Sequence, residues 1–237
     1  MTSFILKIIG IITMFCDHFS DAILGHFTFL NYIGRIAFPI FAYQCAISYK
    51  HTRNFKKHLL KLFIFGLISQ LPFLLFLSTF TKQIYLNIFF TLFLGILTLF
   101  LYDRCKNKIL GFLVVIISSI IGEIIRVDYG AFGIFLIFVF YYFENKINDK
   151  KINICKLNFS LNKLLMYVSV ILLCFIQYIP NIIKTSNLAN HYLLCAFFTS
   201  LSLVFILFYN KKEGPKLKYF FYIFYPLHLI ILYFIGK

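Results

Sequence analysis

The stretch Phe4–Leu24, FILKIIGIITMFCDHFSDAIL, decides the fold of this chain. It is apolar over a length that crosses about 30 Å of hydrocarbon as a helix, and no small-residue cleavage site follows it. We therefore expect a retained first membrane span rather than a removed signal peptide. Asp17 and His18 lie inside this span, where an ionisable side chain costs about 2.5–3.5 kcal/mol. Such side chains usually face the interior of a helix bundle, and function is the first hypothesis for them.

The composition extends this interpretation to the whole chain. Of the 237 residues, 61% are hydrophobic and 13% are charged, against about 45–50% and 25% in soluble domains. The sequence therefore predicts an all-α fold, a polytopic transmembrane helix bundle that forms a single domain over residues 1–237. About nine spans are expected, at residues 4–24, 31–49, 58–78, 84–102, 109–126, 130–143, 162–180, 190–209 and 218–236. The sixth segment is short, so it can either span the membrane or form a re-entrant segment.

Basic residues gather in alternate loops. Eighteen of the 23 Lys and Arg residues lie near the N-terminus or in the loops after the second, fourth, sixth and eighth segments. The opposite loops contain only Lys82, Arg126, Lys184 and Lys237. Because positive charge marks the cytoplasmic side, we expect the N-terminus inside and the C-terminus outside. The net charge of +15 then reflects topology and contact with the lipid bilayer, and it requires no nucleic acid partner.

This topology places ionisable residues from distant segments at a similar depth, in the outer half of the membrane. They are Asp17, His18, Arg35, Asp128 and His228. We expect Asp17 to pair with Arg35, because a buried charge is satisfied by an opposite one. His18 suits proton transfer and His228 is a rival base in a deeper position. The alternative is a purely structural Asp–Arg clamp beside a core histidine. Asp21 is expected to be solvated near the interface.

A second set of polar residues begins the third segment at the cytoplasmic face. Arg53, Lys57 and Lys61 repeat every four residues, so they form one basic stripe if this stretch is helical. With Asn54 beside them, such a helix start suits phosphate, although ordinary positive-inside charge also explains it. The six cysteines show no metal-binding spacing, so we expect no metal. Pro39 frees the carbonyl of Arg35, which can line a polar cavity or simply kink the helix.

Several motifs, taken together, resemble the TraX family of bacterial membrane proteins. They are ITMFCDH at Ile12–His18, IGRIAFPIF at Ile33–Phe41, HTRN at His51–Asn54, ISQLPF at Ile68–Phe73, LNIFFTL at Leu86–Leu92, RVDYG at Arg126–Gly130, Tyr209–Asn210 and FFYIFYPLHL at Phe220–Leu229. They cover almost the whole chain in the expected order. One departure is Lys211, which stands where the family tends to have a glycine after the Tyr-Asn pair.

The resemblance implies an acetyltransferase of the bacterial cytoplasmic membrane. It implies acetyl-CoA as the donor and a peptide or envelope-glycan acceptor on the outer side, such as the pilin amino terminus. By the same resemblance the candidate residues are Asp17, His18, Arg35, Asn87, Asp128 and His228, and we place Asn87 with the donor-binding group. Two alternatives stay open: a proton- or ion-coupled transporter that uses the same charges as a relay, and a non-catalytic membrane assembly factor.

The topology gives a direct prediction. In a variant without the six native cysteines, a cysteine at Lys184 should react with a membrane-impermeant thiol reagent in intact cells. Cysteines at Lys150 and Lys212 should react only after permeabilisation, because their loops carry the positive charge that stays inside. If the cysteine introduced at position 184 reacts only after permeabilisation, the nine-span arrangement is contradicted.

Overall fold

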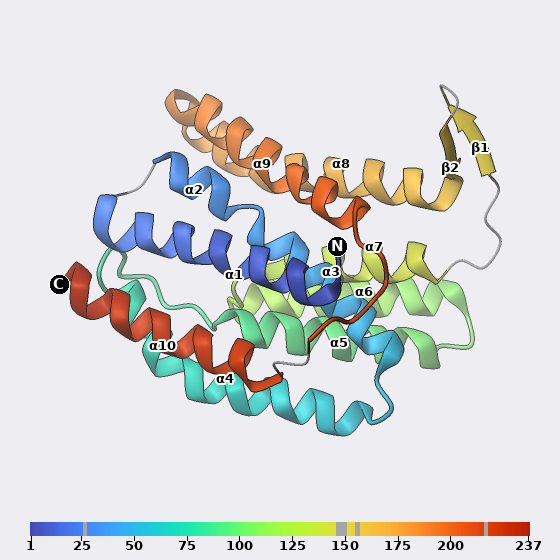
Figure 1. Ribbon diagram of the computed structural model, residues 1–237, viewed down its shortest axis with the longest axis horizontal. Helices are drawn as coiled ribbons and strands as arrows, with labels where there is room; N and C mark the ends of the chain where they lie inside the picture. Colours follow the sequence, from blue (N-terminus) through green and yellow to red (C-terminus); the bar gives the residue numbers. More distant parts are fainter. Residues whose placement is uncertain (26–27, 146–150, 155–156, 216–217) are drawn as a thin grey trace.

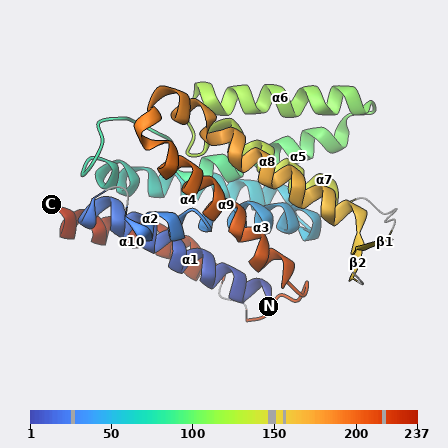
Figure 2. The same cartoon turned by 90° about the horizontal axis from the view of Figure 1, so that it is seen from above.

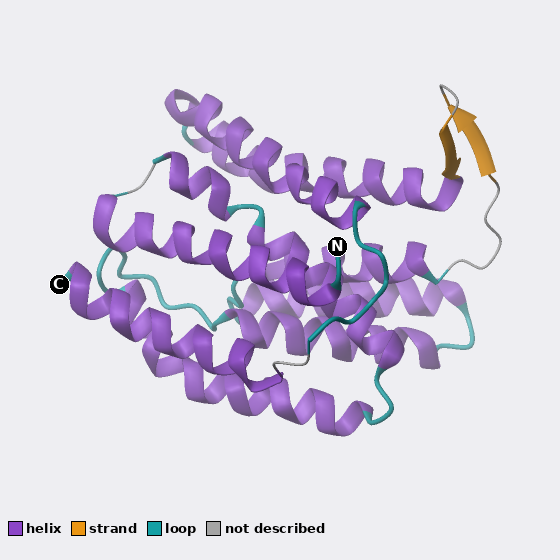
Figure 3. Ribbon diagram, viewed as in Figure 1, coloured by secondary structure: helices purple, strands orange, loops and turns teal. Residues whose placement is uncertain are grey.

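The computed structural model describes residues 1–25, 28–145, 151–154, 157–215 and 218–237, and in these ranges the chain is almost entirely helical (Figures 1 and 3). Its helices are α1 (Ser3–Phe19), the π-helical η1 (Ser20–Leu24), α2 (Phe29–Gly34), α3 (Ala37–His51), α4 (Phe55–Leu77), α5 (Ile88–Arg104), α6 (Lys108–Ile124), α7 (Gly130–Glu144), α8 (Leu161–Lys184), the 3₁₀ turn η2 (Ser186–Leu188), α9 (Ala189–Leu207) and α10 (Lys218–Gly236). The predicted apolar segments thus correspond to helices, with bounds that shift by a few residues, except the second, which is divided between α2 and α3.

Consecutive long helices run in opposite directions, so their ends gather at two ends of the bundle (Figure 1). At one end, Ser3 N–H donates to the carbonyl of Lys212 over 2.8 Å and Lys211 pairs with Glu144 over 3.3 Å. We call this the basic end, because most of the Lys and Arg residues in the described ranges lie there, such as Lys50, Arg104 and Lys212. At the opposite end, Leu86 pairs with Val127 as an isolated β-bridge. Within the bundle α10 lies against α4 and α8 against α9 (Figures 1 and 2).

Among the described residues, five helical segments are long and apolar enough to cross a membrane. They are Ser3–Leu24, Phe55–Leu77, Leu161–Lys184, Ser186–Leu207 and Tyr219–Gly236. The other helices are shorter, because α2 and α3 are separated by a break and α5, α6 and α7 end before 18 residues. The chain is therefore a helix bundle with several candidate membrane spans. The count of nine spans and the cytoplasmic N-terminus stay predictions.

The surface of α6 supports a lipid environment. Its small residues Gly111, Ser119 and Gly122 face inward with Val115, while its large side chains, such as Ile116 and others along the helix, are exposed. An apolar face of this length would be a liability in water but is ordinary against lipid. Small residues at the packed face allow close helix approach, as in membrane bundles.

The predicted second span is not one helix but two. Arg35 and Ile36 form a turn between α2 and α3, and Pro39 lies in the first turn of α3. Proline is tolerated there because the first N–H groups of a helix have no intrahelical partner, whereas in a continuous helix its ring would oppose the carbonyl of Arg35. The break therefore begins a new helix at Ala37 and leaves Arg35 at the junction.

A β-hairpin lies before α8, in a stretch for which the sequence predicts no more than a loop between the sixth and seventh segments. Strands β1 (Lys151–Ile154) and β2 (Leu157–Ser160) pair antiparallel, with Ile154 opposite Leu157 (Figure 3). The hairpin was missed because this polar, basic stretch was interpreted from its composition alone. The loop lysines Lys146, Lys150, Lys156 and Lys216, which support the predicted topology, lie outside the described residues.

Candidate active site

The predicted ion pair between Asp17 and Arg35 is confirmed. Arg35 Nη2 lies 2.9 Å from Asp17 Oδ1, and the Asp17 side chain is 9% exposed. Asn31 Nδ2 donates to the same oxygen over 3.0 Å and to Asp21 Oδ1 over 2.9 Å. Asp21 is half-buried and takes part in this network, so the expectation that it is solvated holds only in part. Asn31 lies one helical turn before Arg35, a spacing from which its membership could have been deduced.

Backbone packing makes this contact possible. A Cβ atom on Gly34 would lie 2.2 Å from Asp17 Cβ, so only glycine permits α2 to approach α1 this closely. The π-helical η1 begins at Ser20 directly after α1, and its wider turn carries Asp21 toward Asn31. Single π-helical turns often occur at functional sites. The sequence thus places two helices in contact at the point where the charges meet.

His18 and His228 form a hydrogen-bonded pair. His18 Nδ1 lies 2.8 Å from His228 Nε2, and His228 Nδ1 lies 2.9 Å from the carbonyl oxygen of Phe224. The prediction of His228 as a deeper, separate base is therefore wrong in its placement. Depth was estimated from sequence distance along each span, which ignores how α1 and α10 tilt and pack. His228 is 3% exposed, whereas His18 is half-buried.

Asp128 lies on a tight turn between α6 and α7. Arg126, Tyr129 and Gly130 all have positive φ values, of 53°, 62° and 44°. Such conformations are uncommon for residues other than glycine and cost about 1–3 kcal/mol each, so other contacts must hold them. Asp128 N–H donates to the carbonyl of Leu86 over 2.7 Å, and Tyr129 stacks on Phe38 with ring centroids 3.8 Å apart.

The same turn brings Asp128 toward the ion pair. Burial raises the pKa of the Asp128 carboxyl above its ordinary value, and the nearby Arg35 guanidinium opposes this rise. Asp17 adds to the rise, as expected for a second carboxylate in range. The structure therefore brings all five predicted residues, Asp17, His18, Arg35, Asp128 and His228, into one region of the bundle. Their catalytic roles stay predictions.

Two polar atoms in this region have no hydrogen-bond partner of ordinary geometry among the described residues. They are Arg35 Nε and the hydroxyl of Tyr225. Tyr225 is 4% exposed, and its ring centroid lies 5.6 Å from that of His228 and 6.5 Å from that of His18. Buried donors are normally paired, so two unpaired ones beside a histidine suit a bound group that accepts hydrogen bonds. Tyr225 was missed, although it lies one turn before His228 in the quoted FYPLHL motif.

The basic stripe is only partly as predicted. Asn54 is the N-cap of α4, and its Oδ1 accepts from Lys57 N–H over 3.0 Å. Arg53 therefore precedes the helix and does not continue a helical row with Lys57 and Lys61, because an N-cap residue takes a non-helical backbone conformation. Lys61 Nζ lies 5.5 Å from the ring centroid of Tyr219 on α10. Arg53, Asn54 and Lys57 are exposed at the basic end.

Asn87 lies at the start of α5 and not in the loop that holds Arg53 and Asn54. It is the N-cap of α5, is fully buried, and donates from Nδ2 to the carbonyl of Gly66 over 2.7 Å and to Gln70 Oε1 over 2.9 Å. Its Oδ1 accepts from Phe89 N–H over 3.0 Å. These bonds fix α4 against α5 and adjoin Leu86, which holds the Asp128 turn. The structure thus places Asn87 beside the candidate site and not beside the donor stripe with which it was grouped.

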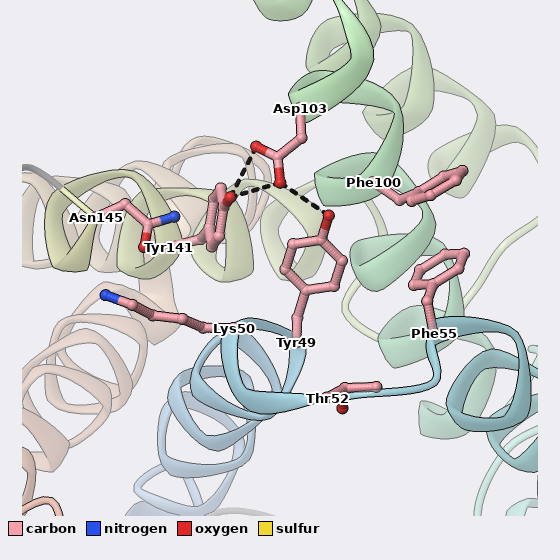
Figure 4. A pocket seen from close by; sticks show the side chains of 8 residues that line it. All are labelled: Tyr49, Lys50, Thr52, Phe55, Phe100, Asp103, Tyr141 and Asn145. Atoms are coloured by element: carbon pink, nitrogen blue, oxygen red, sulfur yellow. Dashed lines mark hydrogen bonds between the residues drawn. The ribbon is translucent and has the colours of Figure 1, made fainter.

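A pocket of about 320 Å³ opens at the basic end (Figure 4). Asp103, one of its lining residues, accepts from Tyr49 over 2.8 Å and from Tyr141 over 2.6 and 2.7 Å. Its lining residues are Tyr49, Lys50, Thr52, Phe55, Phe100, Asp103, Tyr141 and Asn145. The two tyrosines bind the carboxylate and tie the ends of α3, α5 and α7 together. Within the described part of the chain, no three His, Cys, Asp or Glu side chains are grouped so as to hold a metal ion.

The ion pair leads to a prediction. Arg35→Ala should lower the thermal midpoint and folded yield strongly, because it leaves Asp17 buried without a counter-charge, a change that typically costs about 3–5 kcal/mol. Removing both charges, as Asp17→Asn with Arg35→Gln, should recover part of the loss. The control is Lys211→Ala, which breaks the pair of Lys211, 65% exposed, with Glu144 and should have little effect. Thermal unfolding in detergent compares these three variants with the wild type, and a double variant no more stable than Arg35→Ala would contradict the pairing.

Comparisons with known proteins agree with the motifs. The family model described as TraX protein matches residues 3–236. A protein of Dichelobacter nodosus described as "Probable fimbrial assembly protein FimC, serogroup H1" is 26% identical over 248 residues, which cover 98% of this chain and 94% of that protein. No solved structure matches. Since the family model covers nearly the whole chain, this protein belongs to the TraX family.

Proposed function

We propose that this protein is a membrane-embedded acyltransferase that moves an acetyl group from cytosolic acetyl-CoA to an acceptor at the outer side of the bacterial cytoplasmic membrane. Membership of the TraX family and a relative described as a probable fimbrial assembly protein favour this function. They also favour the pilin amino terminus as acceptor over an envelope glycan. The observation that carries the proposal is the half-buried His18 beside unpaired hydrogen-bond donors, in a bundle of apolar helices.

The chemistry needs a base, a stabilised oxyanion and a shielded site. As the acceptor amine or hydroxyl attacks the thioester carbonyl, His18 takes its proton. The carbonyl oxygen then gains negative charge, which the Arg35 guanidinium and the Tyr225 hydroxyl can stabilise with their free N–H and O–H groups. Asp17 holds Arg35 in place through their 2.9 Å contact. Asp128, near Arg35, is available to bind the acceptor.

The donor would enter from the basic end. Arg53, Lys57 and Lys61 gather positive charge there, although they do not form one helical row. His18 lies about 22 Å along the helix from Ser3, given a rise of about 1.5 Å per residue. A donor whose phosphates remain at the basic end must therefore extend a long, narrow arm into the bundle to reach His18. Acetyl-CoA, with its phosphates and thioester at opposite ends of a flexible arm, has the required shape.

Donor binding gives one test. Replacing Arg53, Lys57 and Lys61 by Gln should weaken binding of acetyl-CoA to the purified protein and flatten the salt dependence of that binding, because fewer charge contacts remain to be screened. The matched control replaces Arg104, Lys106 and Lys108, which lie at the same end in another loop, by Gln. If the variant at Arg53, Lys57 and Lys61 binds acetyl-CoA as tightly as the wild type, these charges serve only to mark the cytoplasmic side.

The second test concerns His18. His18→Ala should lower acetyl transfer at least about 100-fold with donor affinity preserved, because it removes the base and not the donor site. Transfer of labelled acetyl from acetyl-CoA to a pilin peptide, measured in vesicles or nanodiscs, follows the reaction. The control is His191→Gln, a histidine on α9 that contacts Tyr32 and Cys195 rather than the site.

Other outcomes would favour the alternatives. Proton-driven solute uptake by wild-type protein in liposomes, without acetyl transfer, would indicate a transporter. Normal pilus assembly in cells that contain only His18→Ala would indicate a non-catalytic assembly factor.

A further inference from the structure

The geometry of the two histidines fixes where their protons lie. A carbonyl oxygen only accepts hydrogen bonds, so His228 Nδ1, 2.9 Å from the oxygen of Phe224, carries a proton. In a neutral imidazole the other nitrogen is then an acceptor. His228 Nε2 therefore presents a lone pair to His18 Nδ1, 2.8 Å away. This contact is a hydrogen bond only if His18 Nδ1 carries the proton.

The ring geometry agrees with such a bond. The two imidazole planes differ by 6° and their centroids are 5.1 Å apart, so the short contact runs edge to edge in a common plane. An in-plane approach aligns an N–H with a ring lone pair. His228 is also held by Phe224, whose ring lies 4.8 Å away at an angle of 13°. His18 lies against Phe76, with centroids 4.9 Å apart.

We infer that His228 is a positioning residue that holds His18 in the tautomer with a proton on Nδ1, so that His18 Nε2 is the free base. This inference rests on the proposed function. No described residue makes a hydrogen bond to His18 Nε2, so its lone pair is available to a substrate. Both nitrogens of His228 are already engaged, and its side chain is 3% exposed, so His228 has no atom with which to act as the base itself.

The proton balance follows from this assignment. The acceptor's nitrogen or oxygen forms a bond to the acetyl carbon, and its proton moves to His18 Nε2. His18 is then an imidazolium that still donates from Nδ1 to His228 Nε2, which favours the charged form. The carbon–sulfur bond breaks, the proton returns from His18 to the departing thiolate, and a free thiol leaves. His228 neither gains nor loses a proton in this sequence.

Nitrogen NMR of the full-length protein tests the tautomer without any substrate. With ¹⁵N-labelled histidine in nanodiscs, His18 and His228 should both show a protonated Nδ1 and an unprotonated Nε2, with each signal assigned by its loss in the Gln variant of that residue. His228→Gln supplies an amide oxygen in place of Nε2 and should keep His18 in this tautomer. His228→Ala supplies none, and His18 should show a mixture. A wild-type spectrum with the His18 proton on Nε2 would overturn the inference.

The transfer assay then tests the consequence. His228→Ala should lose acetyl transfer about 100-fold, while His228→Gln should stay within about tenfold of wild type, with donor affinity unchanged in both. His191→Gln is again the control, and size-exclusion chromatography verifies folding. Equal losses in the Gln and Ala variants would overturn the positioning role. If wild-type protein transfers no acetyl group, the proposed function fails, and the spectrum still decides the tautomer.

Discussion

The contact between Asp17 and Arg35 is the constraint on which the rest of the candidate site depends. Neither charge is tolerable alone among apolar helices, so α1 and the junction of α2 and α3 must meet at one point. Gly34 allows the approach because it has no Cβ atom to collide with Asp17. Asn31 then fills a remaining acceptor position on the carboxylate. Proline at position 39 places the helix break beside Arg35, so a local backbone rule and an electrostatic requirement act on the same turn.

The ion pair also explains why the neighbouring histidines can remain neutral partners of each other. Because Arg35 is matched to Asp17, His18 is not needed as the counter-charge of that carboxylate. His18 Nδ1 instead contacts His228. The His228 ring is oriented by the carbonyl of Phe224, which lies one helical turn earlier. The site therefore separates two kinds of polar contact: a charged pair that fixes helix positions and a neutral pair that fixes a proton. Buried polar groups gain specificity when each has a defined partner.

Much of this arrangement could be predicted from the sequence, and the exceptions share a cause. Apolar length predicted the helices, and the cost of a buried charge predicted the pairing of Asp17 with Arg35. The contact of His18 with His228 was not predicted, because residue counts along separate spans do not reveal how two helices tilt toward each other. Arg53 was placed in a helical row because a spacing of four suggested it, whereas Asn54 caps the helix and ends the row. The periodicity of a sequence shows neither where a residue caps a helix nor how two helices pack against each other.

The two ends of the bundle are held by different kinds of contact. At the basic end the Asp103 carboxylate accepts hydrogen bonds from two tyrosines and ties three helices together, and the exposed lysines and arginines of that end suit contact with anionic lipid. At the opposite end the strained turn around Asp128 is held by Leu86 and by the stack of Tyr129 on Phe38. Strain of this kind persists only when surrounding contacts maintain it, so these contacts hold the turn that places the Asp128 carboxylate near Arg35.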